Sequence, residues 1–313
     1  MIINKNNKVS VIIPAFNKAD FTKRAVLSVV KQTYANIEII IVDDGSVDNT
    51  KKLLTSINDD RIKYFYKNNG GACSARNYGI KKSNGNFLAF LDCDDIYVET
   101  KIEDSLNALK KNPSYKFLYS EVLYIDFDDN IISKSKNYQN HPKSGWIGKK
   151  LILGNYNITN STLVTYRKCI EEVGGFDENI FIPADREYLI RLSTKFKALH
   201  LNKPLTGYRV GNETIFNNLD KALIEFEYVL KKYKNTSIIS NLNFYNNCKS
   251  NNLYNFAKLY AANNQLSKSK KLLFNSLYLN FINSSSVKKI IFIILIYLIP
   301  SFVYSYFKKF KEY

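Results

Sequence analysis

Three carboxylates follow directly on an apolar segment in the first third of the chain. The segment runs from Phe87 to Leu91, and the acids are Asp92, Asp94 and Asp95. Acids this close repel one another unless a cation joins them, and oxygen ligands suit a hard divalent ion such as Mg²⁺ or Mn²⁺. The cluster therefore predicts a metal site. A solvated acidic turn that caps the next helix is the alternative, because Asp-x-Asp is a short and frequent pattern.

A second acidic pair ends another apolar segment. Residues 37–42 lead into Asp43 and Asp44, and Gly45 then permits a tight turn. The run before Asp92 lacks polar alternation, which is typical of a strand buried on both faces of an α/β sheet. Ligands of open α/β sheets bind at the carboxyl ends of the strands. Both acid clusters are therefore expected to line one crevice.

Strands and helices must alternate to bring these strand ends together. Strands are expected over residues 9–14, 37–42, 61–66, 87–91, 117–125, 158–165 and 199–208. Helices are expected over residues 21–31, 72–81, 99–110 and about 184–194, with one more after Asp48. This order predicts the α/β class, with a mostly parallel sheet and helices on both faces.

The last hundred residues change character. Residues 219–233 and 254–279 show the apolar spacing of amphipathic helices. Residues 290–307 are uncharged, have lysine pairs on both sides and are roughly the minimum length for a bilayer span. A helix on the membrane surface, a single span and a buried core helix are all compatible with this segment.

The charge balance favours a membrane surface over nucleic acid. Lys plus Arg number 45 against 28 Asp plus Glu, and the net charge is +17. The lysines are spread along the chain, and three of them follow the C-terminal apolar run. The four cysteines show no C-x-x-C spacing, which predicts reduced thiols without structural zinc. No apolar stretch near the N-terminus resembles a signal peptide, so a cytoplasmic setting is expected.

Four patches, in order, carry a resemblance to a known family. They are residues 9–17, 41–50, 70–79 and 91–95. Together they resemble the family 2 glycosyltransferases of the GT-A fold, a large bacterial group that uses nucleotide-activated sugars. The resemblance covers roughly residues 8–210. It implies a GT-A catalytic domain over residues 1–215, with a nucleotide-binding half to about 112 and an acceptor half after it. A helical region over 216–285 and an apolar, basic membrane-associating segment over 286–313 would follow.

The resemblance implies a UDP-sugar donor and a wall for its base. Pro14, Ala15 and Phe16 would lie beside the uracil, and Asp44 would accept the imide N–H of the ring. Asp44 can instead bond its own backbone as an acid of a β-turn.

The second acid cluster takes the metal and the phosphates in this resemblance. Asp94 is expected to bind Mg²⁺ or Mn²⁺ directly, and Asp92 to lie near the ribose or a metal-bound water. Arg76 would reach a phosphate or hold Asp92, although a surface ion pair is also compatible. Asp95 is expected to be either a helix-start acid or a supporting acid.

The catalytic base of the family matches a position on a later helix. Asp185 would take the proton from the acceptor hydroxyl in a single displacement with inversion. The acid that usually precedes this base is replaced here by Ala184, and Glu187 points away from the face of Asp185. Asp185 can also act as an N-cap.

Two further residues are implied more loosely. Arg209 lies in a segment that lacks the histidine of many relatives, and the resemblance places it at the diphosphate. Trp146 can stack on a sugar or pack in an ordinary way.

The sequence thus predicts a glycosyltransferase on the cytoplasmic face of the membrane, peripheral or single-span. It would move a hexose or N-acetylhexosamine from a UDP-sugar to a cell-surface glycan or lipid-linked acceptor. A non-catalytic sugar-nucleotide-binding protein on the membrane remains an alternative, because of Ala184. A nucleotidyltransferase is disfavoured, since no glycine-rich phosphate loop follows the first strand. No helix-turn-helix, zinc or stacking motif supports nucleic-acid binding.

Overall fold

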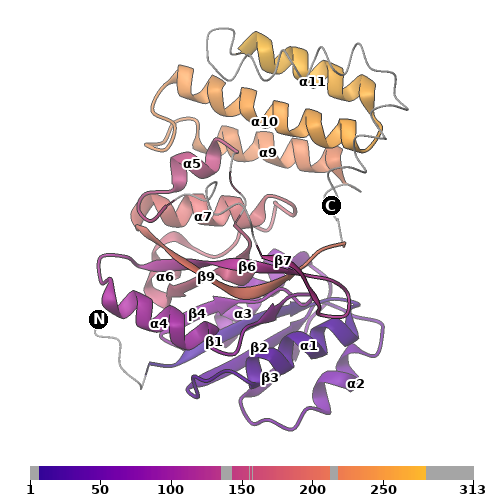
Figure 1. Cartoon of the computed structure of the whole chain (residues 1–313), viewed down its shortest axis with the longest axis vertical. Helices are drawn as coiled ribbons and strands as arrows, with labels where there is room; N and C mark the ends of the chain where they lie inside the picture. The colour runs from indigo at the N-terminus through magenta and orange to yellow at the C-terminus, as the bar shows by residue number, and fades with distance from the viewer. Residues whose placement is uncertain (1–6, 135–142, 155, 157, 212–217, 280–313) are drawn as a thin grey trace. The chain divides into compact units, whose positions relative to one another are not determined.

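Apolar runs form the central strands of a sheet in the first part of the chain. The computed structural model describes residues 7–134, 143–154, 156, 158–211 and 218–279. The chain folds as two units, residues 1–148 with 157–212 and residues 149–156 with 213–313 (Figure 1). Each unit is described by itself below. The three-part domain division expected from the sequence stays a prediction.

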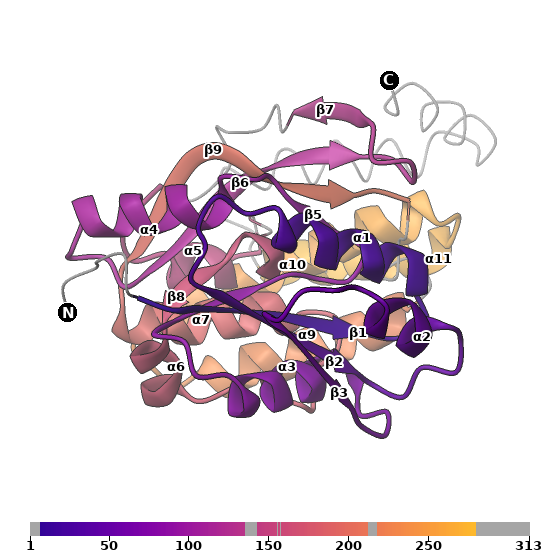
Figure 2. The ribbon, with the colours of Figure 1, turned by 90° about the horizontal axis from the view of Figure 1, so that it is seen from below.

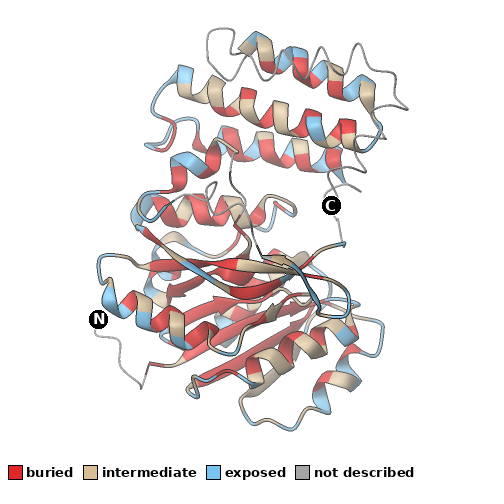
Figure 3. Cartoon of the chain, in the orientation of Figure 1, coloured by how far each residue is buried: buried red, intermediate tan, exposed pale blue. Residues whose placement is uncertain are grey.

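Four parallel strands begin the sheet of the first unit. They are β1 (Val9–Ala15), β2 (Ile37–Asp43), β3 (Ile62–Tyr66) and β4 (Phe87–Phe90). β1 lies between β2 and β4, and β3 pairs with the outer side of β2. Every residue of β1, β2 and β4 is buried, as the unbroken apolar runs predict. Figure 3 shows this core within the strands.

The sheet curls on beyond β4 through shorter and longer strands. These are β5 (Ile96–Tyr97), β6 (Phe117–Ile125), β7 (Ile131–Lys134), β8 (Val164–Tyr166) and β9 (Ala198–Arg209). The order across the described sheet is β3-β2-β1-β4-β8-β6-β9-β5, with β7 added on β6. β8 runs antiparallel to β4 and β6, and β9 runs parallel to β6. Most strands therefore share one direction, as expected.

Helices cover both faces of this sheet. The first unit contains α1 (Ala19–Val30), α2 (Thr50–Thr55), α3 (Gly71–Lys82), α4 (Lys101–Lys111), α6 (Arg167–Val173) and α7 (Ala184–Lys195). Figure 2 shows α1 and α3 on opposite faces. In α4 the buried residues Ile102, Leu106 and Leu109 recur at helical spacing. Acids in its first turn and lysines in its last complement the helix dipole.

The second unit is helical in its described part. It contains most of α5 (Gly148–Ile152), then α9 (Leu219–Tyr233), α10 (Leu242–Ala262) and α11 (Leu266–Leu279). The predicted single helix over 254–279 is wrong, because α10 ends and α11 begins within it. Asn264 adopts a left-handed conformation with φ of 59° at that break. Asparagine tolerates this conformation better than most residues, so an Asn-Asn pair ends the helix.

A second correction concerns residues 158–165. The predicted strand is replaced in its first part by a 3-10 turn, η2 (Asn160–Thr162), and only Val164–Tyr166 is a strand. The Thr159 side chain accepts a hydrogen bond from the Ser161 N–H and caps this turn.

None of the helices in the described part of the chain combines the length and apolar character that a bilayer span requires. The apolar segment 290–307 and the proposed membrane-associating segment 286–313 lie outside the described residues.

Candidate active site

The two acidic clusters come together at one edge of the sheet. β2 ends at Asp43, Asp44 follows it, and the other acids follow β4. Because β1 separates these parallel strands, both clusters flank its carboxyl end. The Asp44 N–H donates to the Ala15 carbonyl over 2.8 Å, which fixes the first cluster against the end of β1.

Asp44 is almost fully buried, and its carboxylate binds the start of α3. Its oxygens accept from the Gly70 N–H at 3.0 and 3.1 Å and from the Gly71 N–H at 2.7 Å. Lys67 Nζ lies 2.6 Å from Oδ1. These partners are 23 to 27 residues away, so Asp44 is more than a β-turn acid. Its predicted contact with uracil stays a prediction.

The predicted base wall begins in the core and ends at the surface. Pro14 and Ala15 are buried at the end of β1, while Phe16 exposes 45% of its surface. Asn17 follows with φ of 50°, a left-handed conformation that turns the chain away from the strand. An exposed aromatic ring directly after the end of β1 suits the face of a flat base.

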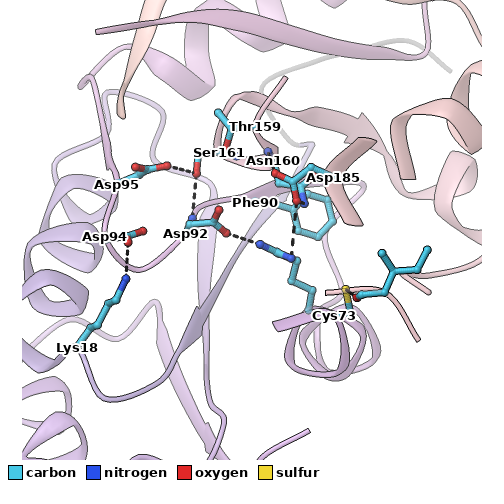
Figure 4. A network of polar contacts seen from close by, with 12 residues as sticks. Lys18, Cys73, Phe90, Asp92, Asp94, Asp95, Thr159, Asn160, Ser161 and Asp185 are labelled. Atoms are coloured by element: carbon cyan, nitrogen blue, oxygen red, sulfur yellow. Dashed lines mark hydrogen bonds and ion pairs between the residues drawn. The ribbon is translucent and has the colours of Figure 1, made fainter. Parts of the chain in front are cut away.

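Asp92 and Asp94 each pair with a cationic side chain. Arg76 of α3 donates to Asp92 Oδ1 over 2.5 Å, and Lys18 Nζ lies 2.5 Å from Asp94 Oδ2 (Figure 4). Arg76 is 5% exposed, so it is no surface ion-pair residue. Burial opposes the charge of Lys18, yet the attraction of Asp94 raises its pKa overall. Asp92 and Asp94, which the family resemblance assigns to a metal, thus each lie within hydrogen-bond distance of a cationic side chain.

Asp95 supports the loop from inside. It is 2% exposed, accepts from Ser161 Oγ at 2.5 Å, and accepts from the Arg209 N–H at 3.0 Å. Burial, and then the charge of Asp92, raise its pKa well above the ordinary range. This supporting position agrees with the role expected from the sequence.

Arg209 is fully occupied by the protein. Its side chain donates to the carbonyls of Asp94 and Asp126 and to the carboxylate of Asp129. It is 4% exposed as a residue. These contacts tie the loop after β4 to the turn between β6 and β7. The predicted contact of Arg209 with a diphosphate stays a prediction.

Asp185 lies in the first turn of α7 and faces the same acids. Its carboxylate is 4.0 Å from Arg76, the arginine that also binds Asp92, and its side chain keeps 29% exposure. Burial raises the pKa of Asp185 to about 6, against the opposing attraction of Arg76. A carboxylate whose pKa lies near neutrality is suited to general-base work.

Sequence reasoning missed the residue that touches Asp185 most closely. Asn160 donates from Nδ2 to Oδ1 over 2.5 Å and from its backbone N–H to Oδ2 over 3.0 Å. Residues 158–165 read as a strand, yet Asn160, Ser161 and Thr162 are three polar residues in a row. That polar run was the available signal for a turn.

The remaining predicted neighbours behave differently. Glu187 is buried and pairs with Arg191 at 2.8 Å, so it lies off the face of Asp185, as helix geometry predicts. Trp146 is 56% exposed, and its sugar-stacking role stays a prediction.

The acids after β4 offer only part of the ligand set that the metal implied by the resemblance requires. Among the described residues, no three His, Cys, Asp or Glu side chains gather into a set that could hold an ion alone. Asp92 and Asp94 provide oxygen donors only, and Lys18 already holds a positive charge against Asp94. These donors would suit a hard divalent ion only if phosphate oxygens and water supplied its remaining ligands.

Comparison with known proteins agrees with this geometry. The family model described as glycosyl transferase family 2 matches residues 10–171. The chain belongs to this family. A protein of Rickettsia bellii named an uncharacterized glycosyltransferase is 33% identical over 223 residues, which is 70% of this chain and 31% of that protein. The chain thus spans about a third of that relative.

An Escherichia coli relative matches over more of its length. The UDP-Glc:α-D-GlcNAc-diphosphoundecaprenol β-1,3-glucosyltransferase WfaP is 36% identical over 229 residues, covering 71% of this chain and 85% of that protein. Among solved structures, S. aureus TarS 1–349 in complex with UDP-GlcNAc has a TM-score of 0.64 at 15% identity. It covers 86% of this chain and 81% of its own, and it shows the shared fold.

Proposed function

We propose that this chain is an inverting glycosyltransferase that moves a sugar from a UDP-sugar to a hydroxyl of a lipid-linked glycan. One observation carries the proposal. Arg76 lies between Asp92, on the predicted donor side, and Asp185, the predicted base. A single buried cation that contacts both acids sets the separation of donor and base. Such fixed geometry is the main requirement of a direct displacement.

The donor would be held at the edge formed by β1, β2 and β4. Pro14, Ala15 and Phe16 would form the wall beside the uracil, and Asp44 would accept the imide N–H of the ring. The UDP-GlcNAc complex of TarS, a protein with the same fold, supports this choice of nucleotide. The name of WfaP, which specifies UDP-Glc, supports it as well.

Asp185 would act on the acceptor. Its carboxylate takes the proton of the acceptor hydroxyl while that oxygen forms a bond to the anomeric carbon, and the bond from that carbon to the UDP oxygen breaks. Attack opposite the departing group inverts the anomeric configuration. Arg76 keeps Asp185 beside the donor and offsets the charge of Asp92.

A divalent cation, Mg²⁺ or Mn²⁺, completes the proposed site. Asp94 would bind it directly, with Asp92 as a second ligand or through a water. When bound, the ion neutralises charge on the departing diphosphate. Lys18, 2.5 Å from Asp94, would have to release this carboxylate.

The names of relatives support the proposed acceptor class. WfaP is named for an acceptor sugar on diphosphoundecaprenol, a lipid carrier in the membrane. A lipid-linked acceptor would place this chain on the cytoplasmic face of the membrane. The apolar, lysine-flanked residues 290–307 are suited to membrane contact as a peripheral or spanning segment.

The test is UDP release from a panel of UDP-sugars, with Mn²⁺ or with chelator, and with membrane lipid extract as acceptor. Wild type should turn over only with the metal. Asp185→Asn should bind UDP and lose turnover, while Asp94→Ala should lose metal-linked UDP binding. Asp60→Asn is the matched control, because Asp60 is an exposed acid outside both clusters.

The outcomes separate the rival functions. UDP binding without turnover for every donor and acceptor extract would favour a non-catalytic sugar-nucleotide-binding protein. No metal-linked UDP binding in wild type would contradict the roles of Asp44 and Asp94.

A further inference from the structure

One asparagine binds both oxygens of the proposed base. Asn160 donates its backbone N–H to one oxygen of Asp185 and its side-chain N–H to the other. A carboxylate offers about four lone-pair positions, and Asn160 occupies two of them. Arg76 lies 4.0 Å from one carboxylate oxygen, and the side chain keeps 29% exposure, so part of the carboxylate stays open to a hydroxyl. Asn160 thus fixes which way the free lone pairs point.

The orientation of the Asn160 amide is set by charge. Its nitrogen faces the Asp185 carboxylate, because an amide oxygen in that place would repel it. The amide oxygen is then buried without a hydrogen-bond partner among the described residues. A buried acceptor without a partner is costly to a fold. An asparagine here is therefore poorly explained by stability alone.

The turn that carries Asn160 is itself held firmly. Lys101 Nζ donates to the Thr162 carbonyl over 2.7 Å, and Thr206 Oγ1 donates to the Ser161 carbonyl over 3.0 Å. Asn160, Ser161 and Thr162 are 0 to 2% exposed. Residues of α4 and β9 thus fix η2 from two sides, so Asn160 approaches Asp185 from a rigid support.

The same turn also reaches the donor-side acids. Ser161 Oγ donates to Asp95 at 2.5 Å and accepts from the Asp92 N–H at 3.1 Å (Figure 4). Adjacent residues of η2 therefore contact the loop after β4 and the start of α7. This places the proposed base and the donor-side loop on one common support.

We infer that Asn160 is a positioning residue, which holds the Asp185 carboxylate in the orientation that receives the acceptor proton. The inference rests on the proposed function. Asn160 does not contact the reacting atoms and acts through Asp185 alone. Its two hydrogen bonds favour the ionised carboxylate, so they also keep the base available.

Other charged groups act on Asp185 and are the same in all variants below. Arg76 lies 4.0 Å away and favours the carboxylate, while Asp92 opposes it. Asp185 in turn raises the pKa of Cys73 and of Tyr208, where burial is the larger cause. Removal of the Asn160 amide leaves each of these influences in place.

The test compares wild type with Asn160→Ala and Asn160→Ser by the pH dependence of kcat/KM for UDP release. The acid limb is the fall of kcat/KM at low pH, where Asp185 becomes protonated. Asn160→Ala should move the midpoint of this limb up by roughly one to two pH units, as expected for the loss of a hydrogen bond to a charged group. Turnover at neutral pH should fall roughly 10- to 100-fold, as for a misplaced reacting group. UDP binding, measured by calorimetry, should stay unchanged. Asn160→Ser keeps a shorter donor and covers the case in which the alanine variant does not fold.

Thr159→Ala is the matched control in the same turn. Thr159 caps η2 and has no hydrogen bond to Asp185 among the described contacts, so its variant should leave the acid limb in place. An equal shift in Thr159→Ala would assign the effect to the turn and overturn the inference. An unmoved limb in Asn160→Ala would overturn it too. Absence of turnover in wild type with every donor and acceptor extract would instead refute the proposed function, and the inference with it.

Discussion

Lys101 has no exposed surface and holds the turn η2 beside the proposed site. Its replacement tests how the burial of this lysine affects folding stability. Its ammonium group donates to Ser120 Oγ over 3.0 Å and to the Thr162 carbonyl of η2 over 2.7 Å. Burial lowers the pKa of Lys101 from its ordinary value of 10.5 to about 7. We expect Lys101→Met to change stability by an amount that depends on pH.

The sign follows from proton binding. Between pH 7 and 10.5 the unfolded chain holds a proton on Lys101 that the folded chain does not, so wild-type stability rises with pH in this window. Each pH unit corresponds to about 1.4 kcal/mol. Below pH 7, burial of the protonated Lys101 therefore lowers the free energy of unfolding by about 5 kcal/mol. At pH 9 about 3 kcal/mol of this loss has disappeared.

Methionine removes this cost and leaves two hydrogen-bond acceptors without their donor. The lost hydrogen bonds and the packing change contribute equally at both pH values, so they cancel in the comparison. The stability of Lys101→Met relative to wild type should thus be about 3 kcal/mol more favourable at pH 6 than at pH 9.

Urea unfolding followed by tryptophan fluorescence measures this difference. Trp146 is the only tryptophan of the chain and belongs to the same unit as Lys101. Lys110→Met, at an exposed position of α4, removes a charge from the same helix and serves as the matched control. The reasoning is refuted if Lys101→Met and wild type differ by the same free energy at pH 6 and pH 9.

Three further predictions concern other parts of the molecule. Burial raises the pKa of Asp185 to about 6, and a general base must be ionised to accept a proton. Wild-type kcat/KM should therefore rise as the pH passes through about 6. A flat profile between pH 5 and 7 would exclude Asp185 as the base. Arg209→Lys places all donors on one nitrogen, so it cannot reach the three separate acceptors that the guanidinium binds. Calorimetry should record a loss of stability of about 2–4 kcal/mol and weaker UDP binding. An unchanged unfolding temperature would contradict the anchoring role. Asn264→Val places a β-branched residue at φ of 59° and should lower stability by roughly 1–2 kcal/mol. This loss should appear as faster hydrogen exchange in α10 and α11. Asn264→Gly, which tolerates this φ, should not accelerate the exchange.

The sequence by itself determined the buried strands that begin the sheet, and the family. The apolar runs of β1, β2 and β4 identify buried strands, because a strand covered on both faces excludes polar alternation. The positions of Asp44 and Asp92 at strand ends follow directly, since parallel neighbours end at the same edge. Local patterns were sufficient here because burial and periodicity are properties of short segments.

Two local patterns were misjudged for physical reasons. The apolar spacing of a helix continues across the Asn263-Asn264 pair, although the left-handed conformation of Asn264 separates α10 from α11. Residues 158–165 satisfied the composition of a strand, yet the cap at Thr159 and contacts to distant residues fold their first part into η2. Tertiary contacts override weak local preference in such short segments.

Only the tertiary structure decided which side chains meet at the site. Asn160 reaches Asp185 across 25 residues, Lys18 reaches Asp94 across 76, and Arg209 reaches the Asp94 carbonyl across 115. No pattern within a segment encodes such partners, because packing of α3, η2, α7 and β9 around the strand ends brings them together. The sequence therefore supplied the chemical groups and the edge at which they lie, and the fold decided which of them hold the others in place.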